Sequence, residues 1–175
     1  MSEKRKERMA FQYNDGGRKE TRKGHTGDCV ARSIAIASGK PYEEVYAVLA
    51  KGNANERVTK RTRVDSQTGR ETASHGINTT RKWFKDQMKE WGFEWTPCMG
   101  IGTGCKVHLV KGELPMGRLV VLLSKHLTAV INGVINDTGD PQRENILQND
   151  DGTKHFAYRC VYGYWEYKRA IRNGM

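Results

Sequence analysis

The chain has 175 residues, and its 30 Lys and Arg against 20 Asp and Glu give a formal net charge of +10. Its hydrophobic content of 37% is low but still typical of a folded protein, and the length predicts one domain spanning residues 1–175. The sequence contains no apolar run of about 18 residues, and residues 1–12 lack the apolar core of a secretory signal. We therefore expect a cytoplasmic protein that does not contact a membrane.

Two segments carry most of the positive charge. A basic N-terminal segment, residues 1–25, holds eight Lys and Arg against four acids, and residues 51–82 hold eight against three. Within the second segment, residues 51–75 form a basic insertion with few apolar residues, which predicts a long exposed loop or a charged hairpin. Clustered cations neutralise phosphates, so nucleic acid or an acidic protein is a candidate partner. A solvated insertion that keeps the protein soluble explains the charge equally well. The candidate contact residues are Lys60, Arg61, Arg63 and Arg70.

The first half of the chain predicts three helices in succession. Apolar residues at helical spacing predict a buried helix with Cys29 in its first turn and Gly39 just after its end. A second helix starts with Pro41 and is expected to end at Gly52. The third ends before Gly92, and its aromatic residues favour a place in the core over base stacking. Its expected N-cap is one of Asn78, Thr79 and Thr80.

The second half of the chain is typical of a sheet, because β-branched and aromatic residues dominate its apolar runs. Residues 97–117 are rich in glycine and predict a loop with one short strand around 107–110, while residues 138–155 predict a polar surface loop. Helices followed by strands indicate an α+β fold, with N-terminal helices packed on a C-terminal antiparallel sheet. The expected strands are Arg118–Leu123, His126–Ile131, Val134–Thr138 and Tyr158–Tyr167.

The dipeptide Asn132-Gly133 between two of these strands is the strongest local signal. Both central residues of a type I′ turn need a positive φ, which Asn and Gly adopt readily. This turn fixes the register, and counting outward places His126 and Asp137 on one face of the hairpin, within reach of each other. Asn136 points to the opposite face. The hairpin therefore predicts Asp137 as the carboxylate that orients the imidazole of His126.

A histidine oriented by a carboxylate can activate a nucleophile, and Cys29 in the first turn of a helix is a suitable candidate for that nucleophile. The helix dipole and the free first-turn N–H groups stabilise a thiolate, and a neighbouring imidazolium adds to this effect. Cys29, His126 and Asp137 thus form a candidate catalytic triad, with the backbone N–H of Cys29 as one oxyanion donor. Alternatively, the cysteine only fills space in the core and the histidine is structural.

Four segments of the chain resemble a group of small phage and prophage proteins with a papain-like, bacteriocin-leader-peptidase-like cysteine protease fold. These segments are YNDGGRK (13–19), 27–49, KHLTAVINGVINDTGD (125–140) and RCVYGYW (159–165). The resemblance implies a bacteriophage origin and a helix bearing Cys29 packed on an antiparallel sheet that bears His126 and Asp137. Residues 51–75 lie outside it.

The chain departs from the papain-like pattern at two positions. Such enzymes usually carry an oxyanion-donating Gln about six residues before the nucleophile, where this chain has Lys23. The preceding loop offers Asn14, Gln12 or Thr26 instead, of which we favour Asn14. In addition, Asp28 adjoins Cys29, and its carboxylate would raise the thiol pKa unless the side chain turns away to cap the helix.

The remaining cysteines do not form a recognisable framework. Four cysteines are too few for a disulfide scaffold, and the reducing environment of the cytoplasm favours free thiols. Cys98, Cys105 and His108 follow the spacing C-x6-C-x2-H, which fits no compact zinc site, so we expect neither a metal nor a cofactor.

The sequence therefore predicts a papain-like phage hydrolase that cleaves a peptide or isopeptide bond through Cys29, His126 and Asp137. Its partner would be a protein or peptide, including a host protein, in the infected bacterium or in the virion. The alternative is an inactive module of the same fold that binds nucleic acid or a host defence protein through the basic insertion.

Overall fold

The computed structural model describes residues 3–24, 27–59, 69–74 and 77–168. Along these residues one strand precedes the helices and the other strands follow them. In chain order they are β1 (Ala10–Tyr13), a short 3₁₀ helix (Arg18–Glu20), α1 (Cys29–Ser38), α2 (Tyr42–Ala54), α3 (Lys82–Glu90), β2 (Phe93–Pro97), β3 (Arg118–Leu123), β4 (His126–Ile131), β5 (Val134–Asp137), β6 (Glu144–Gln148), β7 (Lys154–Tyr158) and β8 (Gly163–Tyr167).

A mixed six-stranded sheet forms the centre, in the order β1-β5-β4-β3-β8-β2. The predicted α+β class is confirmed, but the prediction of a purely antiparallel sheet is wrong. Strand β1 pairs with β5 in parallel, whereas the other neighbours in this sheet are antiparallel. The parallel pair arises because β1 precedes α1 in the chain. In the fold, β1 lies beside the β4–β5 hairpin, which comes much later in the sequence.

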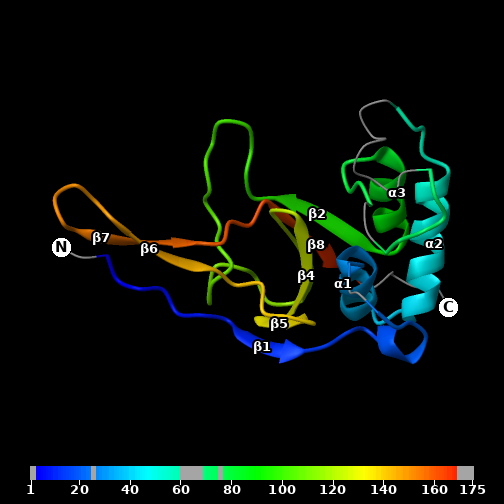
Figure 1. Cartoon of the computed structure of the whole chain (residues 1–175), viewed down its shortest axis with the longest axis horizontal. Coiled ribbons are helices and arrows are strands. Elements are labelled where there is room, and N and C mark those ends of the chain that lie inside the picture. Colours follow the sequence, from blue (N-terminus) through cyan, green and yellow to red (C-terminus); the bar gives the residue numbers. More distant parts are fainter. Residues whose placement is uncertain (1–2, 25–26, 60–68, 75–76, 169–175) are drawn as a thin grey trace.

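The three helices gather at one end of the molecule, and the β6–β7 ribbon projects from the other (Figure 1). Alternate side chains of β3 pack into two hydrophobic cores on opposite faces of the sheet, as expected for a strand buried on both sides. Val120 joins the helices and Trp165 in one core. Leu119 and Val121 join the second core, which the loop after β2 covers with Leu109. Helix α1 is buried along almost its whole length, Arg32 included, because it packs between α2 and the sheet.

The helices confirm most of the predicted boundaries. Helix α1 begins at Cys29 and ends before Gly39, whose φ of 73° lies in the left-handed region. Helix α2 continues past Gly52, where its end was predicted, and this glycine instead makes room for the ring of Trp83, which packs directly against it. The predicted N-cap of α3 is wrong, since Arg81 occupies that position without a side-chain cap.

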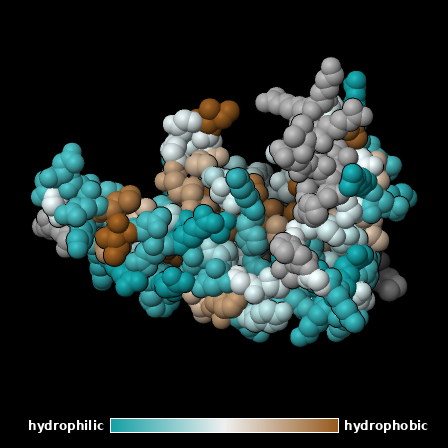
Figure 2. All heavy atoms as spheres, in the orientation of Figure 1, coloured by the Kyte–Doolittle hydropathy of each residue, from teal (hydrophilic) through white to brown (hydrophobic). Residues whose placement is uncertain are grey.

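The predicted strands of the hairpin are confirmed, with β5 ending one residue early. The predicted strand 158–167 is split in two, because β7 ends at Tyr158 and β8 starts at Gly163. The supposed polar loop 138–155 instead contains most of the β6–β7 ribbon, which carries hydrophobic side chains on its surface (Figure 2), with Ile146 62% exposed. The N-terminal segment follows the ribbon and is joined to it by an ion pair between Arg5 and Glu144.

A disulfide joins Cys105 to Cys160, with their Cα atoms 5.8 Å apart. The prediction that both cysteines are free thiols is therefore wrong. The two residues are 55 positions apart, and only the folded chain brings the glycine-rich loop against the segment before β8. The strand predicted around residues 107–110 is reduced to one isolated bridge between His108 and Cys160. Cys29 and Cys98 are free cysteines.

The basic insertion is only partly described. Lys60, Arg61 and Arg63 lie outside the described residues, while Arg70 is exposed. The insertion starts within α2, since residues 51–54 are helical, and its far end returns to the core at the fully buried Ala73. Within the described ranges, no helix is long and apolar enough to span a membrane.

Candidate active site

The β4–β5 hairpin brings His126 and Asp137 into direct contact. Asn132 and Gly133 both have positive φ values, 47° and 79°, as the type I′ turn requires. The paired residues match the predicted register, and His126 Nε2 lies 2.7 Å from Asp137 Oδ2. The predicted choice of Asp137 over Asn136 as the partner of the imidazole is thus confirmed by the geometry.

Four donors saturate the carboxylate of Asp137. Oδ2 contacts His126 and accepts a hydrogen bond of 2.8 Å from the hydroxyl of Thr128, while Oδ1 accepts from Arg32 Nη1 at 2.9 Å and from the Thr138 N–H at 2.7 Å. Burial alone would raise the pKa of Asp137, but the hydrogen bonds and the charge of His126 hold it below its ordinary value. The carboxylate therefore stays ionised and fixed.

Cys29 occupies the first position of α1, which packs against β4, and its sulfur faces His126. Burial raises the pKa of the thiol, but hydrogen bonds from His126 and from the Leu127 N–H, together with the charge of Arg32, lower it on balance. Burial likewise lowers the pKa of His126, but its bonds to Asp137 and Cys29 outweigh this effect and raise it to about 9. The lowered thiol pKa and the raised imidazole pKa both favour the pair of thiolate and imidazolium, the reactive form.

Asp28 turns away from the thiol, as a low thiol pKa requires, but it does not cap the helix. Its carboxylate accepts from Arg18 Nε at 2.9 Å, from Arg32 Nε at 3.0 Å and from the hydroxyl of Tyr42. Two guanidinium groups thus compensate its charge. Arg32 bridges Asp28 and Asp137 with its side chain only 3% exposed. Sequence reasoning missed this arginine, although its i,i+4 spacing from Asp28 was a usable signal.

The favoured second oxyanion donor, Asn14, is engaged elsewhere. Its Nδ2 donates to Asn136 Oδ1 at 3.2 Å, on the face of the hairpin opposite Asp137, and its Oδ1 accepts from the Gly16 N–H. The structure thus contradicts this assignment, because Asn14 is absent from the described residues that line the pocket around Cys29. Gln12 is exposed on β1, and Thr26 lies outside the described residues.

The pocket around Cys29 and His126 has a volume of about 310 Å³. Apolar side chains from α1, β3 and β4 form most of its wall, and Thr79 and Lys125 add polar groups. The free N–H groups of the first turn of α1 begin at Cys29 itself. The Cys29 N–H, with Thr79 and Lys125 in the pocket wall, is a candidate donor to a carbonyl bound at the sulfur.

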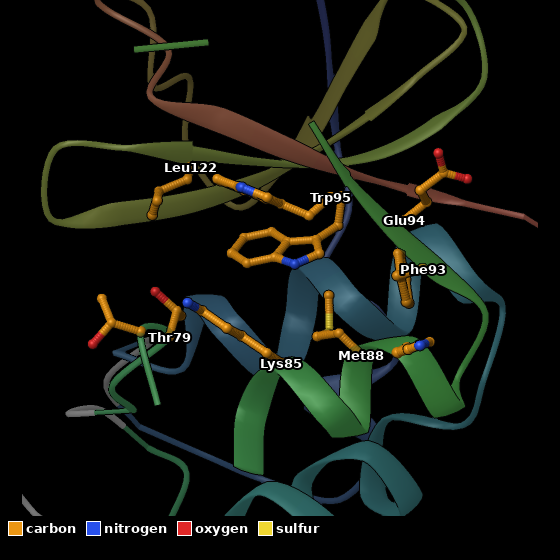
Figure 3. A pocket seen from close by; sticks show the side chains of 10 residues that line it. Thr79, Lys85, Met88, Phe93, Glu94, Trp95 and Leu122 are labelled. Atoms are coloured by element: carbon orange, nitrogen blue, oxygen red, sulfur yellow. The ribbon is translucent and has the colours of Figure 1, made fainter. Parts of the chain in front are cut away.

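An apolar pocket of about 420 Å³ adjoins the Cys29 pocket, and the two share Thr79 and Leu122 as lining residues. Figure 3 shows the indole of Trp95 reaching from β2 into the space between the sheet and α3. Trp95 stays 41% exposed, although its ring packs on Gly163, where a Cβ would come within 2.3 Å. Lys85 stands across the pocket from the sheet.

Comparison with models of known protein families, with curated proteins and with solved structures finds no significant match to this chain. Among the described residues, no group of three or more His, Cys, Asp or Glu side chains could hold a metal ion. The assignment of a function therefore depends on the chemistry of the site itself.

Proposed function

We propose that the protein is a cysteine hydrolase that cleaves a peptide or isopeptide bond. The observation that carries this proposal is the hydrogen-bonded series of Cys29, His126 and Asp137, with a lowered thiol pKa at one end and a saturated carboxylate at the other. A fold of papain-like type and a bacteriophage origin, both implied by the resemblance, belong to the same proposal.

The reaction proceeds in two steps. The thiolate of Cys29 forms a bond to the substrate carbonyl carbon, and the first-turn amides of α1 stabilise the oxyanion. The imidazolium of His126 then gives its proton to the leaving amine, which departs and leaves a thioester. Water attacks this thioester with His126 as the base, the thiolate of Cys29 leaves, and the acid product departs while His126 keeps the water proton, which restores the starting ion pair. Asp137 orients His126 throughout and remains ionised.

The apolar pocket supports a substrate with a large apolar side chain near the scissile bond. It adjoins the Cys29 pocket, and Met88, Phe93 and Trp165 provide buried apolar walls beside the exposed ring of Trp95. An aliphatic or aromatic side chain of the substrate would displace water from these walls, which is favourable.

Alkylation kinetics test the proposal directly. Wild type, Cys29→Ala, His126→Ala and the matched control Cys98→Ala, which removes the other free cysteine, are treated with limiting iodoacetamide at about pH 6. We expect one rapid adduct by intact mass in wild type and in the control. The adduct should be absent in Cys29→Ala and slow in His126→Ala. Equal and slow labelling of all four proteins would remove the basis for catalysis.

The alternative of an inactive binding module depended on the basic insertion, most of whose named residues lie outside the described ranges. The same variants distinguish it, because binding through Lys60, Arg61 and Arg63 would survive Cys29→Ala and weaken steeply with salt.

A further inference from the structure

A polar pocket of about 620 Å³ opens on the other side of His126. It shares Lys125 and His126 with the Cys29 pocket, so a bound chain that passes the imidazole can reach both. Its wall comes from the β3–β4 turn, the segment after β5 and the segment after β7. The site is thus flanked by an apolar pocket on one side and a polar one on the other.

Three cations line this polar pocket and form no ion pair with a described carboxylate: Lys125, Arg143 and Arg159. The two acids in the wall are already engaged. Asp137 is saturated by its own donors, and Asp140 pairs with Arg8 at 2.8 Å. The pocket therefore carries an uncompensated positive charge, and such a site attracts an anion.

Arg159 gives a second, independent indication that this pocket binds an anion. Its terminal nitrogens donate to the carbonyls of Pro141 and Ser124 at 2.9 and 2.8 Å, which holds the guanidinium in place. Its Nε is buried and has no acceptor among the described residues. Buried donors in folded proteins are normally satisfied, so a ligand oxygen that reaches this N–H would supply the partner that it lacks among the described residues. Burial and the charge of Arg143 lower the pKa of Arg159 despite the opposing charge of Asp137, an effect that a bound anion would relieve.

We propose that this pocket binds a carboxylate of the substrate, on the side of the scissile bond away from the apolar pocket. The inference rests on the proposed function and specifies its substrate class. Two guanidinium groups match the two oxygens of a carboxylate, supplied by an Asp or Glu side chain or by a free C-terminus. A nucleic acid would need a continuous basic track, but the pocket on the other side of His126 is mostly apolar.

Cleavage profiling with a mixed peptide library tests the preference, with mass spectrometry as the readout. Wild type is compared with Arg143→Gln, a change at an exposed side chain. The matched control is Lys154→Gln, which removes the same charge from the far end of the β6–β7 ribbon. We expect at least about fivefold enrichment of a carboxylate at one fixed position in wild type and in the control. Arg143→Gln should reduce the enrichment to below about twofold. Amidated and free C-termini in the library distinguish the two carboxylate sources.

A binding measurement keeps the inference separate from catalysis. Fluorescein-labelled peptides that differ only in a central Glu or Gln are titrated onto Cys29→Ala, with and without Arg143→Gln. If the Glu peptide binds more tightly than the Gln peptide, and this difference disappears in Arg143→Gln, the carboxylate site is supported. This holds even if wild type cleaves no peptide, and in that case only the proposed function fails. Equal binding of both peptides overturns the inference. It is also overturned if a single-stranded oligonucleotide binds more tightly than the Glu peptide and this binding requires Arg143.

Discussion

Replacing Arg32 by Met should destabilise the protein by about 3 kcal/mol. The guanidinium is buried and donates to Asp28 at 3.0 Å and to Asp137 at 2.9 Å, so its removal leaves two buried carboxylates short of a partner. Breaking a buried ion pair costs about 3–5 kcal/mol. We expect the lower end of this range, because Asp28 keeps Arg18 and Asp137 keeps His126.

Urea unfolding at pH 7 measures this loss. With a slope of about 2 kcal/mol/M, the midpoint of Arg32→Met should fall by about 1.5 M with the slope unchanged. The matched control Arg22→Met breaks the more exposed pair with Glu43 and should cost less than about 1 kcal/mol. Arg32→Met should also slow iodoacetamide labelling of Cys29 at pH 6, because the charge of Arg32 lowers the thiol pKa. A midpoint for Arg32→Met no lower than that of the control would refute the reasoning.

Three further changes have defined outcomes. Serine at both Cys105 and Cys160 should lower stability by about 4 kcal/mol, since the bridge spans 55 residues, and a wild-type melting temperature insensitive to reductant would contradict this. Gly163→Ala should cost about 1–3 kcal/mol and shift the tryptophan fluorescence, because the new Cβ displaces Trp95; unchanged emission would count against it. Asp137 has a lowered pKa, so its contribution to stability is full above its unfolded pKa and is lost as pH falls through the folded value. Urea curves at pH 7, 4 and 3 should therefore show the gap between wild type and Asp137→Asn closing in acid, and a constant gap would exclude this role.

The parts of the fold that the sequence predicted are those fixed by local chemistry. Asn132 and Gly133 are suited to the positive φ values of one turn type, and the turn alone determines which residues face each other in the hairpin. Gly39 similarly marks the end of α1 through its left-handed conformation. These signals act over a few residues, so the contact of His126 with Asp137 was predictable before any tertiary structure was known.

The parts that the sequence missed depend on contacts between distant segments. Strand β1 is exposed along its whole length and so lacks an alternating pattern, and the β6–β7 ribbon is mostly polar. The role of Arg32 depends on a partner 105 residues away, and the disulfide on one 55 residues away. Asn14 was assigned from its position before the helix, but its amide is held by the far side of the hairpin.

The parallel strand β1 also makes the triad's hairpin vulnerable at its outer edge. Among the residues that the structure describes, Ala10–Tyr13 is the only strand covering that side of β5, and the Asn14 N–H donates to the Asp137 carbonyl at 2.9 Å. Proteolytic removal of residues 1–14 would leave the backbone of β5 as an unpaired edge, a template for another copy of the chain. The same strand, exchanged between two molecules, would form a domain-swapped dimer in which each subunit braces Asp137 of the other.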